Sequence, residues 1–348
     1  MILRAFLLSV SVAGFVVSSG LVRSALPGAG TPLTETKLAY FAEHADEYDT
    51  LFFGSSRAYR GVSPEVFDGI TAAEGVPCRS FNFGAPAARA TDVYNTLCKI
   101  ERLHPPGLRF VFVDPERLQF LTGPDDMLQG PVIDWHDAGT TWLAIAYVLA
   151  ADRDAAHTAR DVGEHLRAFL YRTACIGLAQ EVTRSALGRG ADTSELEAGL
   201  GPRFDGWRPL NSVEADVREG NRERFAKNHR QYAQRLEKLA ADRDDPRPVS
   251  PQALAFLTRI ARKVEDLGAV PIFYAQPGVK RQHDLIAAAR EGAVRNLLRY
   301  DRQDEHPELF AIANRWDAYH LSEQGARRMT EMLARDFVAG YKAGRFQP

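Results

Sequence analysis

Several features are scarce in this sequence, and each scarcity excludes a class of protein. Its 348 residues include only three cysteines, Cys78, Cys98 and Cys175, and none of them stands in C-x-x-C spacing. A disulfide framework and a cysteine-based zinc site are therefore not predicted. The 43 basic and 45 acidic residues nearly cancel, so the basic surface that nucleic-acid binding requires is also missing. With 45% hydrophobic and 25% charged residues, the chain has the composition of a globular protein.

Only the N-terminus carries a long apolar run. Between Arg4 and Arg23 stand 18 residues without a charge, AFLLSVSVAGFVVSSGLV. This length approaches the ~20 residues of a membrane-spanning helix and also fits the apolar region of a signal peptide. We therefore expect residues 1–23 to act as a signal peptide or an N-terminal membrane anchor, and we favour the uncleaved anchor. The expected location is extracytoplasmic, periplasmic or at the cell surface, with the chain tethered to the membrane.

Short apolar runs alternate with helical periodicity from about Tyr48 onward, which predicts an α/β fold with a parallel sheet. Start signals frame two of the helices: Ser63-Pro64 opens one that ends at Gly75, and Ser250-Pro251 opens one that ends at Gly268. Five strands are predicted, at 49–54, 78–84, 108–114, 269–275 and 295–301.

A long stretch of chain separates the third and fourth predicted strands. Residues 121–249 are too many for an ordinary connection, so this stretch must have structure of its own. We interpret it as a largely helical insertion at the carboxyl edge of the sheet, within a domain of residues 45–348; a separate domain is the alternative. Helices are predicted at 141–151, 159–187 and 212–243, separated by the Gly/Pro-rich residues 199–210.

Two short motifs could carry chemistry. The first strand ends on Gly54-Ser55-Ser56, which would place the Ser56 hydroxyl at the carboxyl edge of the sheet, where open α/β sheets bind ligands. Near the other end of the chain, Asp317 and His320 are three residues apart and would share one face of a helical turn. Taken singly, the first motif is a common turn and the second a satisfied histidine near a helix start. Together they have the residue types of a Ser-His-Asp triad.

The order of these motifs indicates a type of serine hydrolase. The G-x-S-x-G signature of α/β-hydrolases is absent, since Arg57 and Ala58 follow Ser56. A serine after the first strand and an Asp-x-x-His block before the last helix resemble the SGNH/GDSL hydrolase superfamily. The resemblance covers residues 45–118 and 250–340. It implies a flavodoxin-like three-layer sandwich around a parallel five-stranded sheet.

The resemblance also implies roles for single residues. Ser56 would be the nucleophile, His320 the base and Asp317 the group that orients it. The N–H groups of Ser56 and Gly84, the glycine after the second strand, would bind the oxyanion. The family's Gly-x-Asn-Asp block after the third strand reads VDPERLQF here, without the asparagine that would be a third donor.

Ser55 stands where the family motif has an aspartate. A Gly-Ser-Ser motif also occurs in the branch that contains the membrane-tethered D-alanylation protein of teichoic acids, related to polysaccharide O-acyltransferases. Three neighbours of the motifs, Arg57, Glu116 and Gln276, are candidates for substrate binding, although for Arg57 we favour a structural salt bridge. No cofactor is predicted. No metal is predicted either, because the DWHD stretch at 134–137 lacks a second ligand cluster.

These observations favour an extracytoplasmic serine esterase or O-acyltransferase that acts on an acylated saccharide or cell-envelope polymer. A membrane-bound protein that donates the acyl group is an expected partner, and nucleic acid is not. A secreted hydrolase of small esters or acetylated sugars is a second enzymatic reading. A catalytically silent envelope protein that binds polysaccharide or a partner protein is the alternative from a different class.

Overall fold

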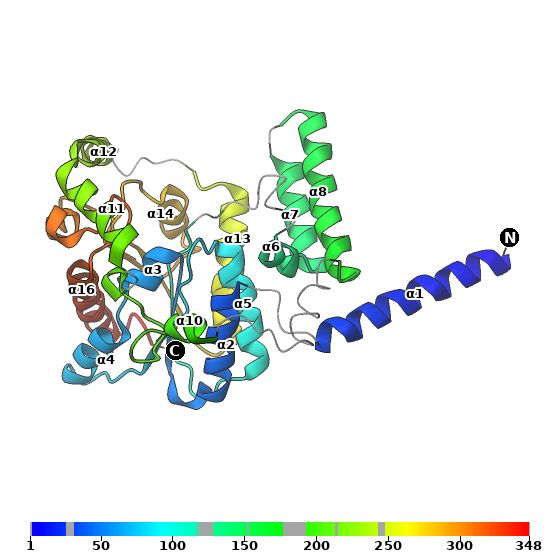
Figure 1. Cartoon of the computed structure of the whole chain (residues 1–348), viewed down its shortest axis with the longest axis horizontal. Coiled ribbons are helices and arrows are strands. Elements are labelled where there is room, and N and C mark those ends of the chain that lie inside the picture. The colour runs from blue at the N-terminus through cyan, green and yellow to red at the C-terminus, as the bar shows by residue number, and fades with distance from the viewer. Residues whose placement is uncertain are drawn as a thin grey trace. The chain divides into compact units, whose positions relative to one another are not determined.

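The fold is described from a computed structural model (Figure 1). It describes residues 2–25, 31–116, 118, 127, 129–151, 153–176, 193–212, 215–242 and 248–347. The chain divides into two compact units. The helical unit comprises Met1–Glu35 and Gln119–Leu196, and the sheet unit comprises Thr36–Leu118 and Glu197–Pro348. The predicted insertion at 121–249 is thus shared between the two units.

A five-stranded, all-parallel sheet forms the centre of the sheet unit. Its order is β2-β1-β3-β4-β5, which is the doubly wound order of flavodoxin-like folds. Each strand lies within a predicted one, so the predicted α/β class and parallel sheet are confirmed. The strands are β1 (Thr50–Phe53), β2 (Ser80–Asn82), β3 (Phe110–Val113), β4 (Val270–Ala275) and β5 (Leu297–Arg299).

Helices cover both faces of this sheet. On one face, α4 (Pro64–Ala73) packs against α16 (Glu323–Lys342), and the ring of Phe337 on α16 contacts Phe110 and Phe112 of β3. Side chains alternate along a strand, so Val111 and Val113 face the opposite side. There α13 (Pro251–Asp266) packs against α5 (Ala90–Leu103) and α14 (His283–Arg290). The sheet unit therefore has three layers.

The helix start signals act as the sequence predicts. Ser63 caps α4 by accepting a hydrogen bond from the Val66 N–H at 3.5 Å, and Ser250 caps α13 through the Ala253 N–H at 3.1 Å. In both helices a proline occupies the first turn. The charged run at 212–243 forms two helices, α11 (Ala215–Lys227) and α12 (Arg230–Ala241). Other helices of this unit are α3 (Ser56–Gly61) and α15 (Pro307–Phe310), while α2 (Pro32–Glu43) and α10 (Thr193–Ala198) each span a sequence boundary between the two units.

The helical unit is built around α8 (Ala155–Thr173), against which α7 (Ala138–Ala150), α6 (Gly130–Trp135) and α1 (Ile2–Ala25) pack. The helix predicted at 141–151 is confirmed by α7, whereas residues 177–187 of the next predicted helix lie outside the described residues. Within the described part of the chain, no helix combines the length and the apolarity needed to cross a membrane.

Candidate active site

Ser56 lies where β1 gives way to a helix. β1 ends at Phe53, and Gly54 follows at a point where the backbone is crowded: a Cβ there would lie 2.7 Å from the Cβ of Ala58 and 3.2 Å from that of Asp114. Ser56 is then the first residue of α3, and the Ser55 hydroxyl caps this helix by accepting from the Arg57 N–H at 3.3 Å. The Ser55 cap therefore starts a short helix directly after the strand.

His320 meets Ser56 from the other end of the chain. The Ser56 Oγ and the His320 Nε2 lie 2.9 Å apart, although 264 residues separate them in the sequence. The other ring nitrogen, Nδ1, lies 2.9 Å from Oδ2 and 3.1 Å from Oδ1 of Asp317. A proton on Nδ1 donates to this carboxylate and leaves Nε2 to accept from the serine hydroxyl. The three predicted residues therefore form one hydrogen-bonded chain.

The Asp317–His320 segment is a tight turn, so the predicted helical turn is wrong. Asp317 Oδ1 accepts from the backbone N–H groups of Tyr319 at 2.7 Å and His320 at 2.8 Å, which bends the chain back before α16. Burial alone would raise the pKa of the Asp317 carboxyl. The hydrogen bond and charge of His320, together with these two N–H donors, outweigh burial and lower that pKa.

The side chain of Arg315 stabilises the same turn through hydrogen bonds to the backbone. Its side chain is 1% exposed and donates to three backbone carbonyl oxygens: Pro277 at 3.1 Å, Asp317 at 3.3 Å and Ala318 at 3.0 Å. Burial lowers the pKa of this guanidinium to about 10, so it remains charged at neutral pH. Because Pro277 follows β4, the arginine ties the turn to the carboxyl edge of the sheet.

The two predicted oxyanion donors differ in their surroundings. Ser56 is the first residue of α3, so its N–H has no acceptor within the helix, and none is found elsewhere in the described residues. The Gly84 N–H donates to the Asn82 Oδ1 at 2.8 Å. Gly84 also lies tightly against α3, where a Cβ would approach the Tyr59 nitrogen to 2.4 Å. An oxyanion would have to share the Gly84 N–H with Asn82.

Asn82 connects β2 to the helix that carries Ser56, a role that the sequence reasoning missed. Its amide nitrogen donates to the carbonyl oxygens of Ala58 at 2.9 Å and Val62 at 2.8 Å, while its Oδ1 accepts from Gly84. Asn82 is fully buried at the end of an apolar strand. A polar residue inside the run SFNF was the available signal for such a role.

A buried lysine donates hydrogen bonds to backbone carbonyl oxygens of the segment that contains Asn82 and Gly84. Lys37 of α2 donates to the backbone oxygens of Asn82 at 2.7 Å, Gly84 at 2.7 Å and Gly206 at 2.8 Å. Its ammonium also lies 4.1 Å from the centre of the Tyr59 ring. Burial, reinforced by the charge of Arg60, lowers the pKa of Lys37 well below its usual value. Nothing in the sequence around Lys37 indicates this position.

The predicted substrate-binding residues lie next to Ser56 and bind one another. Arg57 donates to the Gln276 carbonyl oxygen at 2.7 Å, and its guanidinium lies 3.5 Å from a carboxylate oxygen of Glu116. The Ser55 hydroxyl donates to the same carboxylate. The Gln276 amide is buried and donates to Asp114 at 2.9 Å. Burial raises the pKa of Asp114 to about 6, although the charge of Arg57 opposes this shift.

No protein-family model matches the chain, and no curated protein matches it. Among the described residues, no group of three His, Cys, Asp or Glu side chains is placed to hold a metal ion.

Proposed function

We propose that this protein is a serine esterase or O-acyltransferase of the SGNH/GDSL type. One observation carries the proposal: the Ser56 hydroxyl, the His320 imidazole and the Asp317 carboxylate follow one another at hydrogen-bond distance. They do so beyond the carboxyl end of β1, the edge at which doubly wound sheets bind substrates. The strand order β2-β1-β3-β4-β5 supports the same assignment.

The proposed reaction is acyl transfer in two steps. Ser56 Oγ attacks the ester carbonyl carbon while His320 Nε2 takes the hydroxyl proton, and the Asp317 carboxylate stabilises the imidazolium. The tetrahedral intermediate collapses with cleavage of the ester C–O bond, and His320 returns the proton to the departing alcohol. Water or a sugar hydroxyl then attacks the acyl-serine, loses its proton to His320, and releases the acyl group as His320 reprotonates Ser56.

Oxyanion stabilisation separates the enzyme from the alternative, a silent envelope protein that binds polysaccharide or a partner. The Ser56 N–H supports the enzyme, because it lies beside the attacking oxygen and has no acceptor among the described residues. Two observations favour the silent protein. The Gly84 N–H already donates a hydrogen bond to Asn82, and the segment VDPERLQF has no asparagine that could serve as a third donor. Loss of one such donor costs on the order of 2.7–4 kcal/mol in transition-state stabilisation.

The proposal includes an extracytoplasmic location at a membrane, where an acylated saccharide or envelope polymer is the substrate and a membrane-bound acyl donor the partner. The surface of the helical unit supports this location. Among the described residues, all but three of the exposed large hydrophobic side chains belong to this unit; the exceptions are Leu103, Phe204 and Tyr319. The uncharged helix α7 exposes Trp142, Ala146 and Leu149 along one stripe, which suits the interfacial region of a bilayer.

A fluorophosphonate probe tests the proposed chemistry, because it labels only serines that an oriented base activates. Labelling of the wild-type protein that disappears in Ser56→Ala supports the enzyme. His320→Ala should also lose labelling and ester turnover while it keeps the wild-type circular dichroism spectrum. A folded wild-type protein that takes up no label would support the silent alternative, and undiminished ester cleavage by His320→Ala would eliminate the proposed base.

A further inference from the structure

An exposed aromatic side chain stands beside the proposed base. Tyr319 precedes His320, and it is 47% exposed. Its backbone is fixed, because its N–H donates to Asp317 at 2.7 Å. An exposed tyrosine ring on a rigid turn is a ready surface for the apolar face of a sugar ring. Because Tyr319 is the residue next to the proposed base, its ring is a candidate contact for the part of a substrate next to the reacting ester.

Arginines from α11 and α12 accompany the aromatic rings of this turn. Arg235 of α12 donates to the Tyr319 hydroxyl at 2.8 Å, and its guanidinium lies 5.5 Å from the centre of that ring. Arg222 of α11 lies 5.4 Å from the centre of the Trp316 ring. Within the described part of the chain, neither arginine forms an ion pair. Their remaining N–H donors and their charge are available to an anion.

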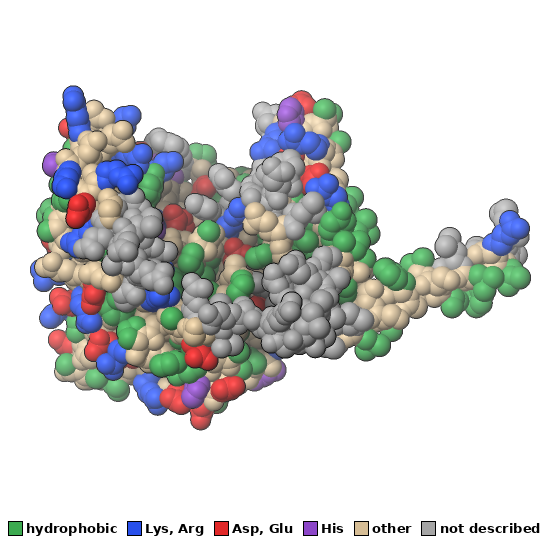
Figure 2. Space-filling model, viewed as in Figure 1, with side chains coloured by type: hydrophobic (Ala, Val, Ile, Leu, Met, Phe, Trp, Pro, Cys, Tyr) green, Lys and Arg blue, Asp and Glu red, His purple; other side chains and the backbone are tan. Residues whose placement is uncertain are grey.

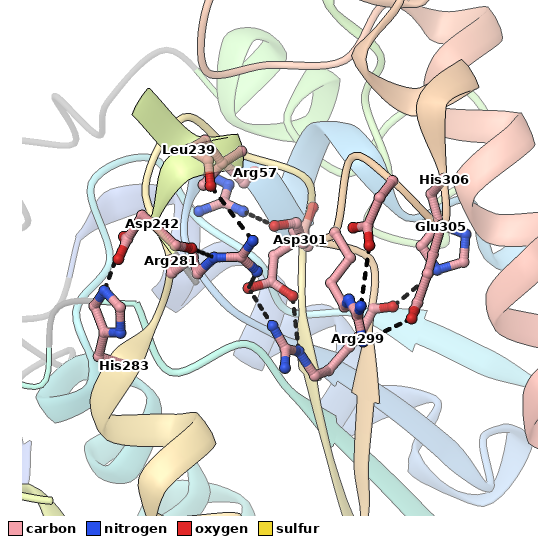
Figure 3. A network of polar contacts seen from close by, with 12 residues as sticks. Arg57, Leu239, Asp242, Arg281, His283, Arg299, Asp301, Glu305 and His306 are labelled. Carbon is pink, nitrogen blue, oxygen red and sulfur yellow. Dashed lines mark hydrogen bonds and ion pairs between the residues drawn. The ribbon is translucent and has the colours of Figure 1, made fainter. Parts of the chain in front are cut away.

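The C-terminal end of α12 is fixed to the carboxyl edge of the sheet by a polar network (Figure 3). Arg281, which follows β4, donates to the carbonyl oxygens of Leu239 and Asp242 at the end of α12. Its guanidinium lies 3.9 Å from the buried carboxylate of Asp301, which pairs with Arg299 at the end of β5 at 2.9 Å. This anchoring holds the helix that presents Arg235.

A further hydrogen bond fixes α12 near its start. The Tyr232 hydroxyl donates to the Phe310 carbonyl oxygen at 2.9 Å, and the Tyr232 ring lies 5.9 Å from the guanidinium of Arg315, the brace of the Asp317–His320 turn. Basic side chains gather over α11 and α12 in the space-filling view (Figure 2). The arrangement of Arg235 and Tyr319 is therefore held from both ends of the helix, on a positively charged surface.

We propose that Tyr319 and Arg235 form a subsite for an acylated saccharide that carries negative charge. The inference rests on the proposed function and specifies its substrate. The Tyr319 ring stacks on a sugar ring, and Arg235 donates to a carboxylate or phosphate of the same or the next sugar. Arg222 adds positive charge to the same edge. Neutral acylated saccharides lack the anionic contact and are poorer substrates.

Three acetyl esters test the subsite: acetylated polygalacturonate, acetylated xylan and 4-nitrophenyl acetate. For each polymer ester, kcat/KM is expressed relative to kcat/KM for 4-nitrophenyl acetate. In Arg235→Gln, this relative value should fall about tenfold for acetylated polygalacturonate because KM rises, whereas it should change little for acetylated xylan. Arg235→Lys should recover part of the loss. Arg79→Gln is the matched control, since Arg79 pairs with Glu47 beside the amino end of β2, at the opposite edge of the sheet. Tyr319→Ala should raise KM for both polymers.

Competition identifies the anion. Inhibition by unacetylated polygalacturonate but not by phosphorylated starch fragments assigns the subsite to carboxylates, and the reverse assigns it to phosphates. Equal losses on the anionic and neutral polymers in Arg235→Gln, or none, would overturn the subsite. Calorimetric binding of polygalacturonate to Ser56→Ala, weakened by adding Arg235→Gln, separates the two proposals. A binding loss without turnover by the wild type retains the subsite and rejects the esterase.

Discussion

Replacement of Asn82 tests whether its side chain holds the helix of Ser56 in place. In Asn82→Asp, the Oδ1 that accepts from the Gly84 N–H is kept, but an oxygen replaces the nitrogen that donates to Ala58 and Val62. The Ala58 oxygen retains the Val62 N–H as a donor at 3.1 Å. The Val62 oxygen is left without a donor among the described residues, so the two losses together cost about 2–4 kcal/mol of unfolding free energy.

The loss should also depend on pH. Burial raises the pKa of the introduced carboxyl above its value in the unfolded chain, so the native state binds the proton more tightly. The free energy of unfolding of Asn82→Asp relative to wild type therefore falls as pH rises from about 4 toward 8. Protonation at low pH restores one donor. Asn82→Ala loses these two bonds and also the one from the Gly84 N–H, but it introduces no charge, so its deficit should not change with pH.

Urea denaturation at pH 5 and pH 8 measures both effects. Tryptophan fluorescence reports on the relevant region, because the Trp207 indole N–H donates to the Arg60 carbonyl oxygen of α3 at 3.1 Å. A midpoint for Asn82→Asp that equals the wild type at both pH values would show that Asn82 does not hold α3. A deficit of the same size at both pH values would refute the raised pKa of the introduced carboxyl.

Two further predictions concern Asp114 and the helical unit. The folded pKa of Asp114, about 6, exceeds the ~3.9 of an unfolded aspartate, so its contribution to stability falls as pH rises from about 4 to 6. Asp114→Asn should therefore be more stable than wild type at pH 8, by up to ~3 kcal/mol of unfolding free energy measured by urea denaturation. The difference should vanish at pH 4, and a higher stability of the variant at pH 4 would contradict the raised pKa of Asp114. Trp142→Gln combined with Leu149→Gln should lower the partition coefficient onto phospholipid vesicles, measured by sedimentation, at least about a hundredfold, since burying each large apolar side chain contributes roughly 1.5–3 kcal/mol. Leu103→Gln, an exposed leucine of the sheet unit, is the control, and equal reduction by both would refute lipid contact through α7.

The sheet was predictable because its strands carry strong local signals. The five apolar runs are bounded by glycine, proline and charged residues, and the parallel order follows from the helices between them. The helix starts at Ser63 and Ser250 follow from a cap and a proline. The approach of Ser56 to His320 was also predictable, since a serine after β1 and a histidine before the last helix both fall at the carboxyl edge.

Contacts between distant segments were not predictable in the same way. The turn at Asp317 looks helical from its spacing, yet its carboxylate competes for the backbone N–H groups of Tyr319 and His320 and closes a turn instead. The partner of the Gly84 N–H depends on the rotamer of Asn82, which no sequence pattern reports. The division of the 121–249 stretch between two units likewise depends on packing rather than on local propensity.

Lys37 has a practical consequence for dissecting the protein. A fragment starting at residue 45, the predicted domain boundary, would lack the ammonium group that joins the backbones of Asn82, Gly84 and Gly206. Three buried carbonyl oxygens would then lose a donor together, in the loop directly behind the nucleophile's helix. Any truncated form intended for crystallisation or activity assays must therefore begin upstream of α2, and a library of N-terminal deletions should lose soluble expression abruptly once that helix is cut.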